Sequence, residues 1–306
     1  MPILAFVQLA LSMLIVGVSV TLGKMAVDHM PVIALAGVRC SAAALALWPL
    51  ARLERAKGKP RPPNKRERLD LMAQAFFGVF AFTLLMLGGI ERTSASEAGL
   101  IAATMPLVIM VLALPLLGEG LSGRALLAAT VATVGIALVT LTGNGGTTGT
   151  NRMLGNALVV CAVVAEALYT LFAKRLADRI PPALMALRLN LIALAMFAPL
   201  LALQPWGVLI ETVPLEAWGI GALYGVGTSA VALLLWYRGT RRVAGGVAGL
   251  FTVFLPVGAI GSAAWLLDEA IGTRHVLGGA VIVAALVIGL APQRGIPAHP
   301  AARPRG

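Results

Sequence analysis

The sequence predicts an all-α membrane protein in which ten transmembrane helices form two five-helix repeats of inverted topology. Three observations lead to this prediction: an apolar composition, ten apolar runs long enough to span a bilayer, and an ungapped internal repeat at a spacing of 150 residues. Together they exclude a soluble globular domain.

The composition places the chain in a membrane. Of its 306 residues, 59% are hydrophobic and only 12% are charged, and the mean hydropathy is +0.91. A soluble domain of this length cannot bury so much apolar side chain. Only helices and closed barrels satisfy every backbone group inside a bilayer, and continuous apolar runs, as opposed to short alternating segments, favour helices.

Ten apolar runs have the length of about 20 residues that a membrane-spanning helix needs. They are residues 3–23, 31–51, 69–90, 95–117, 122–142, 153–173, 181–203, 214–237, 243–267 and 272–291. Short connections with Pro, Gly or charged residues separate most of them. No stretch suggests a separate soluble domain.

The internal repeat is clearest where residues 98–119 return as residues 248–269. Ala-Gly-Leu at 98–100 recurs at 248–250, and Glu119 recurs as Glu269. The same register pairs Lys24 with Lys174, Asp28 with Asp178, Pro31 with Pro181, Pro49 with Pro199, Pro106 with Pro256 and Arg124 with Arg274. We therefore predict a first repeat at residues 1–145, a second at 150–292 and a basic cytoplasmic tail at 293–306.

Five helices in each half have a topological consequence. Because five is odd, the second half enters the membrane from the opposite side, which gives the inverted repeat of many secondary transporters. The alternative is that the duplication only built a stable bundle. With the N-terminus in the cytoplasm, 18 Lys and Arg residues fall on cytoplasmic segments, and four, Lys24, Arg92, Arg152 and Arg274, fall on the opposite side. We expect both termini in the cytoplasm.

Several other functions are not supported by any motif. The first apolar run is too long for a signal-peptide core and has no basic residue before it, so we expect it to be retained. Cys40 and Cys161 lie within predicted helices and suggest neither a disulfide nor a metal site. Residues 143–149 are Gly-rich but lack the Gly-Lys-Ser or Gly-Lys-Thr ending of a phosphate-binding loop. The basic residues sit in short juxtamembrane loops and do not suggest nucleic-acid binding. We expect no cofactor, no metal and no enzymatic activity.

Charged residues at membrane depth are candidates for function, because burying them in lipid is costly. Arg39, Glu166 and Arg188 all fall within apolar runs. We hypothesise that Glu166 and Arg188 form an ion pair or flank the substrate path. A purely structural pair that holds two helices together is the alternative. Arg39 is a candidate partner for Glu97 near the outer end.

Paired helix breaks are the second functional feature. Pro106 and Pro256 lie near the middle of predicted helices, where each frees the carbonyl four residues earlier, at Ala102 and Thr252. Such a break can form a hinge or offer carbonyls to a ligand, although kinks also occur in structural helices. The predicted hinge residues are Gly99, Pro106, Gly249 and Pro256.

Aromatic and hydroxyl side chains on the third and eighth helices suggest a central cavity, because these helices hold equivalent places in the repeat. Such groups suit a small amphiphilic solute, although an aromatic stripe also occurs in lipid-facing and core positions. The predicted cavity residues are Phe80, Thr83, Thr104, Glu166, Tyr169, Tyr224, Thr228, Ser229 and Thr252.

These features resemble the EamA branch of the drug/metabolite transporter superfamily. The resemblance covers residues 3 to 291. It is carried by the lysines that close the first and sixth helices, by Arg39, by the Ala-Gly-Leu to Pro stretches, and by the Leu-Leu-Gly-Glu and Leu-Leu-Asp-Glu endings. The segment Val16-Gly17-Val18-Ser19 departs from the pattern, because no aromatic residue precedes the Gly.

The resemblance implies a carrier of the bacterial inner membrane that exports small metabolites by alternating access. Neutral and aromatic amino acids are the substrates that we expect. A sugar-phosphate or nucleotide-sugar exchanger is one alternative, and a membrane-embedded transferase is another. The expected partners are the small-molecule substrate and the lipid bilayer, with no nucleic acid, and we expect the monomer to be functional.

Overall fold

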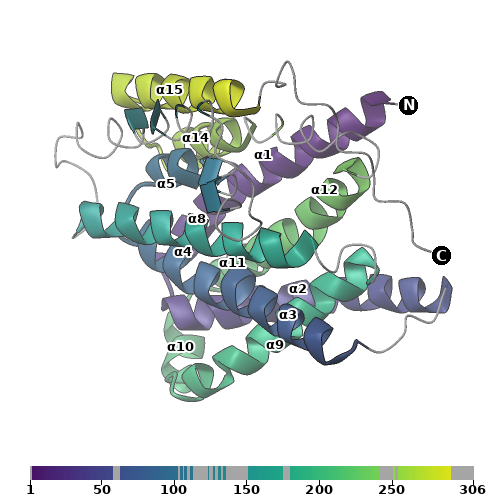
Figure 1. The fold of residues 1–306 in the computed structure, drawn as a ribbon. Coiled ribbons are helices and arrows are strands. Elements are labelled where there is room, and N and C mark those ends of the chain that lie inside the picture. Colours follow the sequence, from purple (N-terminus) through teal and green to yellow (C-terminus); the bar gives the residue numbers. More distant parts are fainter. Residues whose placement is uncertain are drawn as a thin grey trace, which may run out of the picture.

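The computed structural model describes residues 2–57, 63–102, 104–105, 107–108, 111–112, 123, 127, 130–131, 134–135, 151–174, 180–240, 251 and 254–290. Every regular element among these residues is a helix, and none of them belongs to a strand (Figure 1). The all-α prediction is therefore confirmed for the described part of the chain.

The first half contains α1 (Pro2–Val27), α2 (Val32–Lys57), α3 (Lys65–Gln74), η1 (Ala75–Ala81), α4 (Phe82–Ile90) and α5 (Ala95–Ala102). The elements α3, η1 and α4 form one continuous helix, in which η1 is a wider π-helical segment. A reciprocal capping box starts it: the Asn64 side chain accepts from the backbone of Glu67, and the Glu67 carboxylate accepts from the backbone of Asn64.

The second half contains α8 (Arg152–Lys174), α9 (Pro182–Ala202), α10 (Trp206–Thr212), α11 (Leu215–Val226), η2 (Gly227–Ala232), α12 (Leu233–Thr240), α14 (Phe254–Leu266) and α15 (Thr273–Leu290). The predicted runs leave residues 204–213 as a connection, but the structure forms α10 there. Pro205 and Pro214 are the N-cap residues of α10 and α11. Since proline interrupts helical hydrogen bonding, these two residues separate α10 from the long helices around it.

Among the described residues, six helices are long and apolar enough to cross a membrane. They are Ile3–Val27, Val32–Ala56, Lys65–Ile90, Arg152–Tyr169, Pro182–Ala202 and Leu215–Trp236. Two shorter apolar helices, Phe254–Leu266 and His275–Ala285, fall within the ninth and tenth predicted runs. Most of the fourth and fifth runs lie outside the described residues, so the count of ten stays a prediction.

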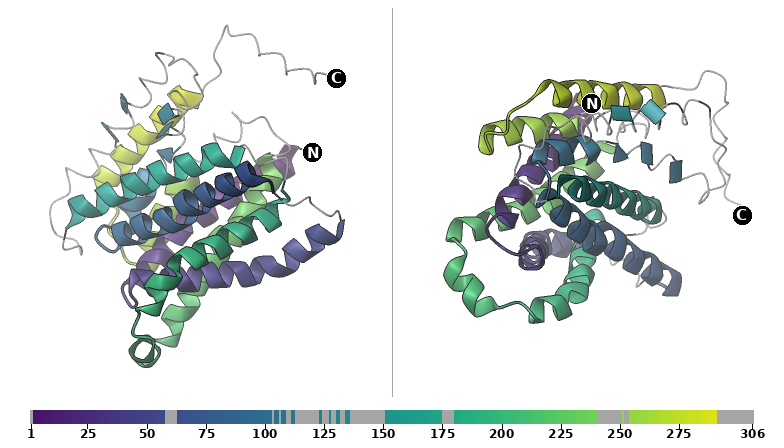
Figure 2. Two further views of the ribbon diagram at one scale, coloured as in Figure 1. Left: turned by 60° about the horizontal axis from the view of Figure 1, so that its bottom comes forward. Right: turned by 90° about the vertical axis from the view of Figure 1, so that its left-hand side faces the viewer.

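The helices pack in a pattern that recurs between the two halves (Figure 2). The helix α1 packs against α14 and against the helix formed by α11, η2 and α12. In the same way, α8 packs against α5 and against the helix formed by α3, η1 and α4. The helix α2 packs along α9, its equivalent in the other half. A shift of 150 residues also carries η1 onto residues 225–231, which overlap η2.

Glycines allow the closest helix crossing, between α1 and α14. A Cβ on Gly17 would lie 2.7 Å from the backbone nitrogen of Ala259, and one on Gly258 would lie 2.5 Å from the carbonyl oxygen of Leu14. Backbones this close leave no room for side chains, which is how small residues stabilise helix pairs in membranes. This crossing joins the first helix of one half to the second half.

We predict that Gly258→Ala destabilises the protein, because the added methyl group collides with the backbone of α1. The matched control is Gly261→Ala on the same helix, since a Cβ there meets no atom within 4 Å. In a thermal unfolding assay in detergent, Gly258→Ala is expected to lower the melting temperature by several degrees, about 1–3 kcal/mol, whereas Gly261→Ala leaves it unchanged. Equal effects of the two substitutions would contradict the close crossing.

Candidate functional site

The buried guanidinium of Arg39 is the centre of the candidate site. Arg39 lies on α2 and is only 5% exposed. Its backbone packs directly on Gly225 of α11, where a Cβ would lie 2.8 Å from the Cα of Arg39. The crossing of α2 and α11 therefore fixes where the arginine side chain starts, and its charged end must find partners inside the bundle.

Side chains from three other elements surround this guanidinium. Nη1 donates a hydrogen bond to the Thr83 hydroxyl at 2.6 Å, and Nη2 donates to the Ser229 hydroxyl at 3.3 Å. The guanidinium carbon lies 5.4 Å from the centre of the Tyr224 ring, within the range of a cation–π interaction. Thr83 belongs to α4 in the first half, whereas Tyr224 and Ser229 belong to α11 and η2 in the second. The cluster of Arg39, Thr83, Tyr224 and Ser229, which we call the Arg39 cluster, joins both halves.

The Nε atom of Arg39 is buried and has no hydrogen-bond partner. A buried N–H group without an acceptor is unfavourable by about 1–3 kcal/mol. Such groups mark places where a water molecule or a ligand supplies the acceptor. The Arg39 cluster therefore has an unused donor on its only cation.

Glu166 brings the opposite charge to the same region. It projects from α8, and it interacts electrostatically with both Arg39 and Tyr224. Glu166 on α8 and Arg39 on α2 are thus close enough for their charges to interact, although they belong to different halves. This arrangement has the two charges that complement a zwitterion.

The other predicted cavity residues make separate contacts. The Thr228 hydroxyl donates to the Tyr224 carbonyl of its own helix at 2.6 Å. The Tyr169 ring occupies the space beside Gly78, where a side chain would collide with it. The ring centres of Phe80 and Phe197 are 4.6 Å apart. The Thr104 hydroxyl donates to the Ile101 carbonyl at 2.7 Å, and no described contact joins it to the Arg39 cluster.

The ion pairs differ from those we hypothesised. The cation that interacts with Glu166 is Arg39, whereas Arg188 interacts with Arg55 near the end of α2. The charge of Glu166 therefore interacts with that of Arg39, and the charge of Arg188 with that of another cation, Arg55. The hypothesis that Arg39 pairs with Glu97 is wrong, because Glu97 binds Arg152.

Glu97 and Arg152 form a buried pair that the sequence analysis missed. The Arg152 Nε donates to both carboxylate oxygens of Glu97 at 2.9 Å. The Asn156 amide donates to Glu97 at 2.9 Å, and Glu97 has no exposed surface. Arg152 begins α8 and Glu97 lies in the first turn of α5, so the pair ties together the starts of these two helices. Both residues lie beside predicted connections, and the sequence analysis uses Arg152 only in the count of basic residues that sets the orientation in the membrane.

The Leu-Leu-Asp-Glu ending also has a structural role. Asp268 follows α14 with a φ of +50°, a left-handed conformation that Asp and Gly adopt more readily than other residues. The chain then turns so that the Glu269 carboxylate accepts from the backbone N–H groups of Ala95 and Ser96 at 2.9 and 3.2 Å. A carboxylate at this position satisfies the unpaired donors that start α5.

The predicted hinge residues are only partly visible. Gly99 packs so closely on α14 that a Cβ would lie 2.1 Å from the Cβ of Ala259. Pro256 is buried, two residues after the described start of α14. Pro106, Gly249 and Thr252 lie outside the described residues.

Two buried amides were also missed. Gln74 has no exposed surface, and neither atom of its amide has a hydrogen-bond partner. Asn190 is 3% exposed and donates to the Ala186 carbonyl, but its Oδ1 has no partner. The repeat register could have identified Gln74, because it pairs this residue with Tyr224 of the Arg39 cluster.

Comparison with known proteins identifies the family. The model of the EamA-like transporter family matches residues 3–141 and again residues 153–290. The chain is 31% identical to the uncharacterized transporter YetK of Bacillus subtilis (strain 168), over 97% of this chain and 90% of YetK. It is 23% identical to the uncharacterized transporter YyaM of the same organism, over 74% of each protein. A crystal structure of a protein with 19% identity has the same fold, with a TM-score of 0.62 over 92% of this chain and 94% of that one.

The apolar helices, the repeated family match and the similarity to transporters define a multi-pass membrane transporter. The chain belongs to the EamA-like transporter family, within the drug/metabolite transporter superfamily. The resemblance drawn from the sequence is confirmed, as is the presence of two repeats.

We predict that Arg152→Ala is strongly destabilising, because it leaves the Glu97 carboxylate buried without its cation. Breaking a buried pair in this way costs about 3–5 kcal/mol. The matched control is Glu91→Gln, which removes an exposed pair with Arg92 and should cost less than about 1 kcal/mol. Thermal unfolding of the purified variants measures both. A loss no larger for Arg152→Ala than for Glu91→Gln would show that the buried pair is not important for stability.

We predict that Asp268→Gly leaves the melting temperature unchanged or raises it, because Gly adopts the left-handed conformation without strain and occupies the equivalent position, Gly118, in the first repeat. Asp268→Val is expected to cost about 1–2 kcal/mol. If both substitutions lowered the melting temperature equally, the side chain of Asp268 and not its backbone conformation would matter.

Proposed function

We propose that the protein is a secondary transporter that exports small metabolites, in particular neutral and aromatic amino acids, across the bacterial inner membrane by alternating access. The observation that carries this proposal is the Arg39 cluster, a buried guanidinium with an unused donor at the junction of the two halves, whose charge interacts with that of Glu166.

The chemistry of this site fits a free amino acid. A guanidinium recognises a carboxylate with its planar set of donors, and Arg39 Nε is available for that contact. Glu166 supplies the negative charge that an ammonium group requires. The rings of Tyr224, Tyr169 and Phe80 are the groups that we propose for contact with an apolar or aromatic side chain of the substrate.

The alternating-access mechanism follows from the repeat. The five helices that we predict for each half would place the two halves in opposite orientations, and the Arg39 cluster takes side chains from both. We propose that rotation of one half against the other exposes the site to each side in turn, with Gly99, Pro106, Gly249 and Pro256 as hinges. In the structure, the Glu97–Arg152 pair joins the starts of α5 and α8. The Glu269 carboxylate joins the start of α5 to the end of α14.

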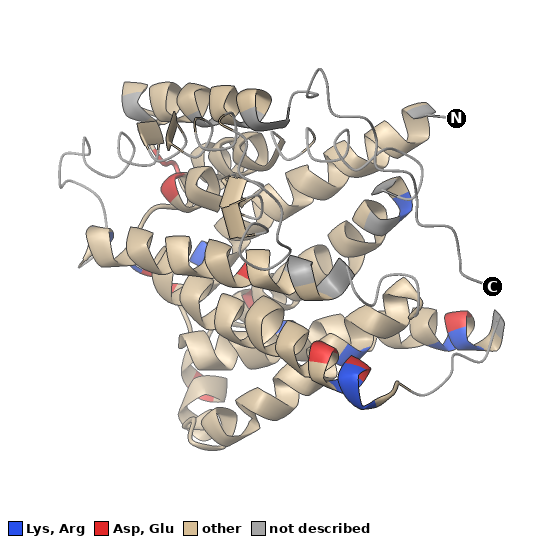
Figure 3. Ribbon diagram, viewed as in Figure 1, with Lys and Arg blue, Asp and Glu red and all other residues tan. Residues whose placement is uncertain are grey.

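The orientation in the membrane is inferred from charge. The Lys and Arg residues at the end of α2 and the start of α3 gather at one end of the bundle (Figure 3). We assign this end to the cytoplasm, together with both termini, and we propose that the monomer is functional. Glu166 is our candidate for carrying a proton if an ion gradient drives transport.

Two alternatives remain for the same fold. A sugar-phosphate or nucleotide-sugar exchanger would bind a doubly charged phosphate, which favours several cations, whereas the charge of Arg39 is balanced by Glu166. A membrane-embedded transferase would chemically change its substrate. Measuring both solute flux and product formation with the purified protein distinguishes these functions from amino-acid transport.

The test is uptake of radiolabelled neutral and aromatic amino acids into proteoliposomes, with empty liposomes as the control and with or without an imposed pH gradient. Saturable uptake of unmodified amino acid is the expected result. A response to the gradient that disappears in Glu166→Gln would assign the proton-carrying role. Well-folded protein that transports no amino acid would overturn the substrate class.

We predict that Arg39→Lys lowers kcat/KM for transport by about tenfold or more, because Lys keeps the charge but loses the planar donors. Arg39→Gln should abolish transport. The matched control is Arg92→Gln, since the Arg92 side chain is 38% exposed and its guanidinium bonds to Glu91 and to the Gly88 carbonyl. Full transport by Arg39→Lys and Arg39→Gln would contradict a role in substrate binding.

A further inference from the structure

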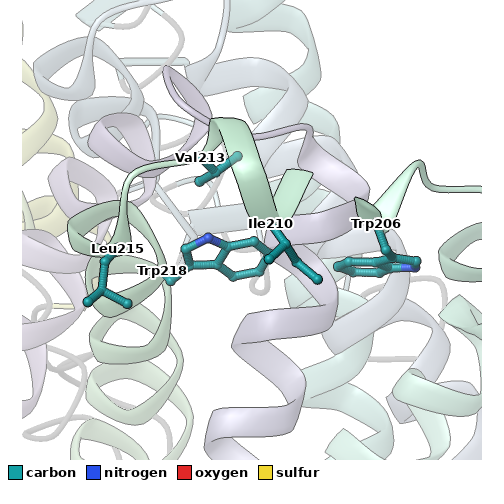
Figure 4. Close-up of a pocket in the computed structure, with 5 residues that line it drawn as sticks. All are labelled: Trp206, Ile210, Val213, Leu215 and Trp218. Atoms are coloured by element: carbon teal, nitrogen blue, oxygen red, sulfur yellow. The ribbon is translucent and has the colours of Figure 1, made fainter. Parts of the chain in front are cut away.

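The short helix α10 forms a pocket that the transport mechanism does not use. The pocket has a volume of about 400 Å³ and is lined by Trp206, Ile210, Val213, Leu215 and Trp218. Figure 4 shows the Ile210 side chain between the indoles of Trp206 and Trp218, whose ring centres are 6.5 Å apart. Trp206 is held in place because its indole N–H donates to the Leu201 carbonyl at 2.8 Å. Every residue that lines this pocket is apolar or aromatic.

The surface beside this pocket is apolar and exposed. Within and around α10, Ile210 is 69% exposed, Leu215 is 87% exposed and Val208 is 56% exposed. Because α9 ends at Ala202 and α11 begins at Leu215, this surface lies between the ends of two helices that are long and apolar enough to cross a membrane. An apolar patch of this kind on a membrane protein is expected to contact lipid.

The position of α10 also places it at the membrane boundary. The start of α9 lies beside the basic end of α2, because the Leu184 backbone N–H donates to the Glu54 carboxylate at 3.0 Å. The 21 residues of α9 then span about 30 Å. Consequently, α10 lies at the opposite end of the bundle from the basic cluster (Figures 1 and 3). Tryptophan is enriched at this depth of the bilayer.

The charge around the pocket indicates which part of a lipid it fits. No Lys or Arg occurs between residues 189 and 237, and the acidic Glu211 and Glu216 flank the pocket. In the other repeat, a shift of 150 residues pairs α10 with Ala56-Lys57-Gly58-Lys59-Pro60-Arg61-Pro62, a basic segment without a large apolar side chain. None of the five residues that line the pocket carries a positive charge, so the pocket offers an apolar lining and no cation for a phosphate headgroup.

We propose that this pocket binds one acyl chain of a phospholipid from the leaflet at this end of the bundle. The indoles of Trp206 and Trp218 hold the upper part of the chain, and Ile210 and Leu215 contact it from α10 and α11. The site is a property of the second half alone, because the first half has the basic segment in its place. It is independent of which metabolite is transported.

The test uses tryptophan fluorescence in vesicles. The chain has five tryptophans, and replacing Trp48, Trp236 and Trp265 by Phe leaves Trp206 and Trp218 as the only emitters. This variant is reconstituted in phosphatidylcholine with bromine atoms on the upper acyl chain, which quench neighbouring indoles. Iodide in the buffer reports exposure to water. We expect the brominated lipid to reduce the emission by about half or more, and iodide to have little effect.

Matched substitutions separate a binding pocket from general contact with lipid. Ile210→Asn and Leu215→Asn alter the pocket lining, whereas Val208→Asn alters an exposed apolar residue of the same helix that does not line it. We expect the first two to lower quenching by the brominated lipid about two-fold and Val208→Asn to leave it unchanged. Circular dichroism confirms that each variant is folded.

Three outcomes would overturn the proposal. Strong quenching by iodide with no effect of the brominated lipid would mean that water fills the pocket. Protection from both quenchers would mean that protein covers it, as in a dimer. Equal quenching in Ile210→Asn, Leu215→Asn and Val208→Asn would mean that α10 touches lipid without a defined chain-binding pocket.

Discussion

The burial of one guanidinium constrains the centre of this protein. A cation at membrane depth is stable only if polar groups surround it, and those groups must come from whichever helices meet there. For Arg39 they come from Thr83 in the first half and from Tyr224 and Ser229 in the second. The wider π-helical turns η1 and η2 lie close to these contacts, which is common at functional sites. The contacts of the Arg39 guanidinium therefore depend on how the helices of the two halves pack against each other.

The two halves share a fold but differ in chemistry. The repeat register pairs Arg39 with Leu189, Glu166 with Val16 and Thr83 with Leu233. Each functional side chain of the centre is thus present once, on a framework whose helix packing is repeated. A symmetric framework permits two equivalent end states, and we propose that the asymmetric set of charged and polar side chains forms one site that serves both states. The Leu-Leu-Gly-Glu and Leu-Leu-Asp-Glu endings also differ in one residue. That difference is compatible with the same backbone, because Gly and Asp both adopt a left-handed conformation readily.

The sequence was sufficient for the helical fold, the repeat and several members of the site. Apolar runs and a constant register depend on local patterns, and Arg39, Thr83, Tyr224 and Ser229 stand out as polar groups within such runs. The partners of the charges were not predictable in the same way. Glu97 pairs with Arg152, and the charge of Glu166 interacts with that of Arg39, because helix crossings and not sequence distance decide which side chains come close. The helix α10 was missed because seven residues between two prolines carry no clear periodicity.

The most direct test of this account compares the binding of a transported amino acid with that of its carboxamide analogue, measured by calorimetry on the purified protein. The two ligands differ only in the group that we place on Arg39. The account predicts that the carboxamide binds at least about tenfold more weakly, or about 1.4 kcal/mol, and that this difference disappears in Arg39→Gln. Equal binding of acid and amide to the unmodified protein would show that Arg39 does not recognise a carboxylate.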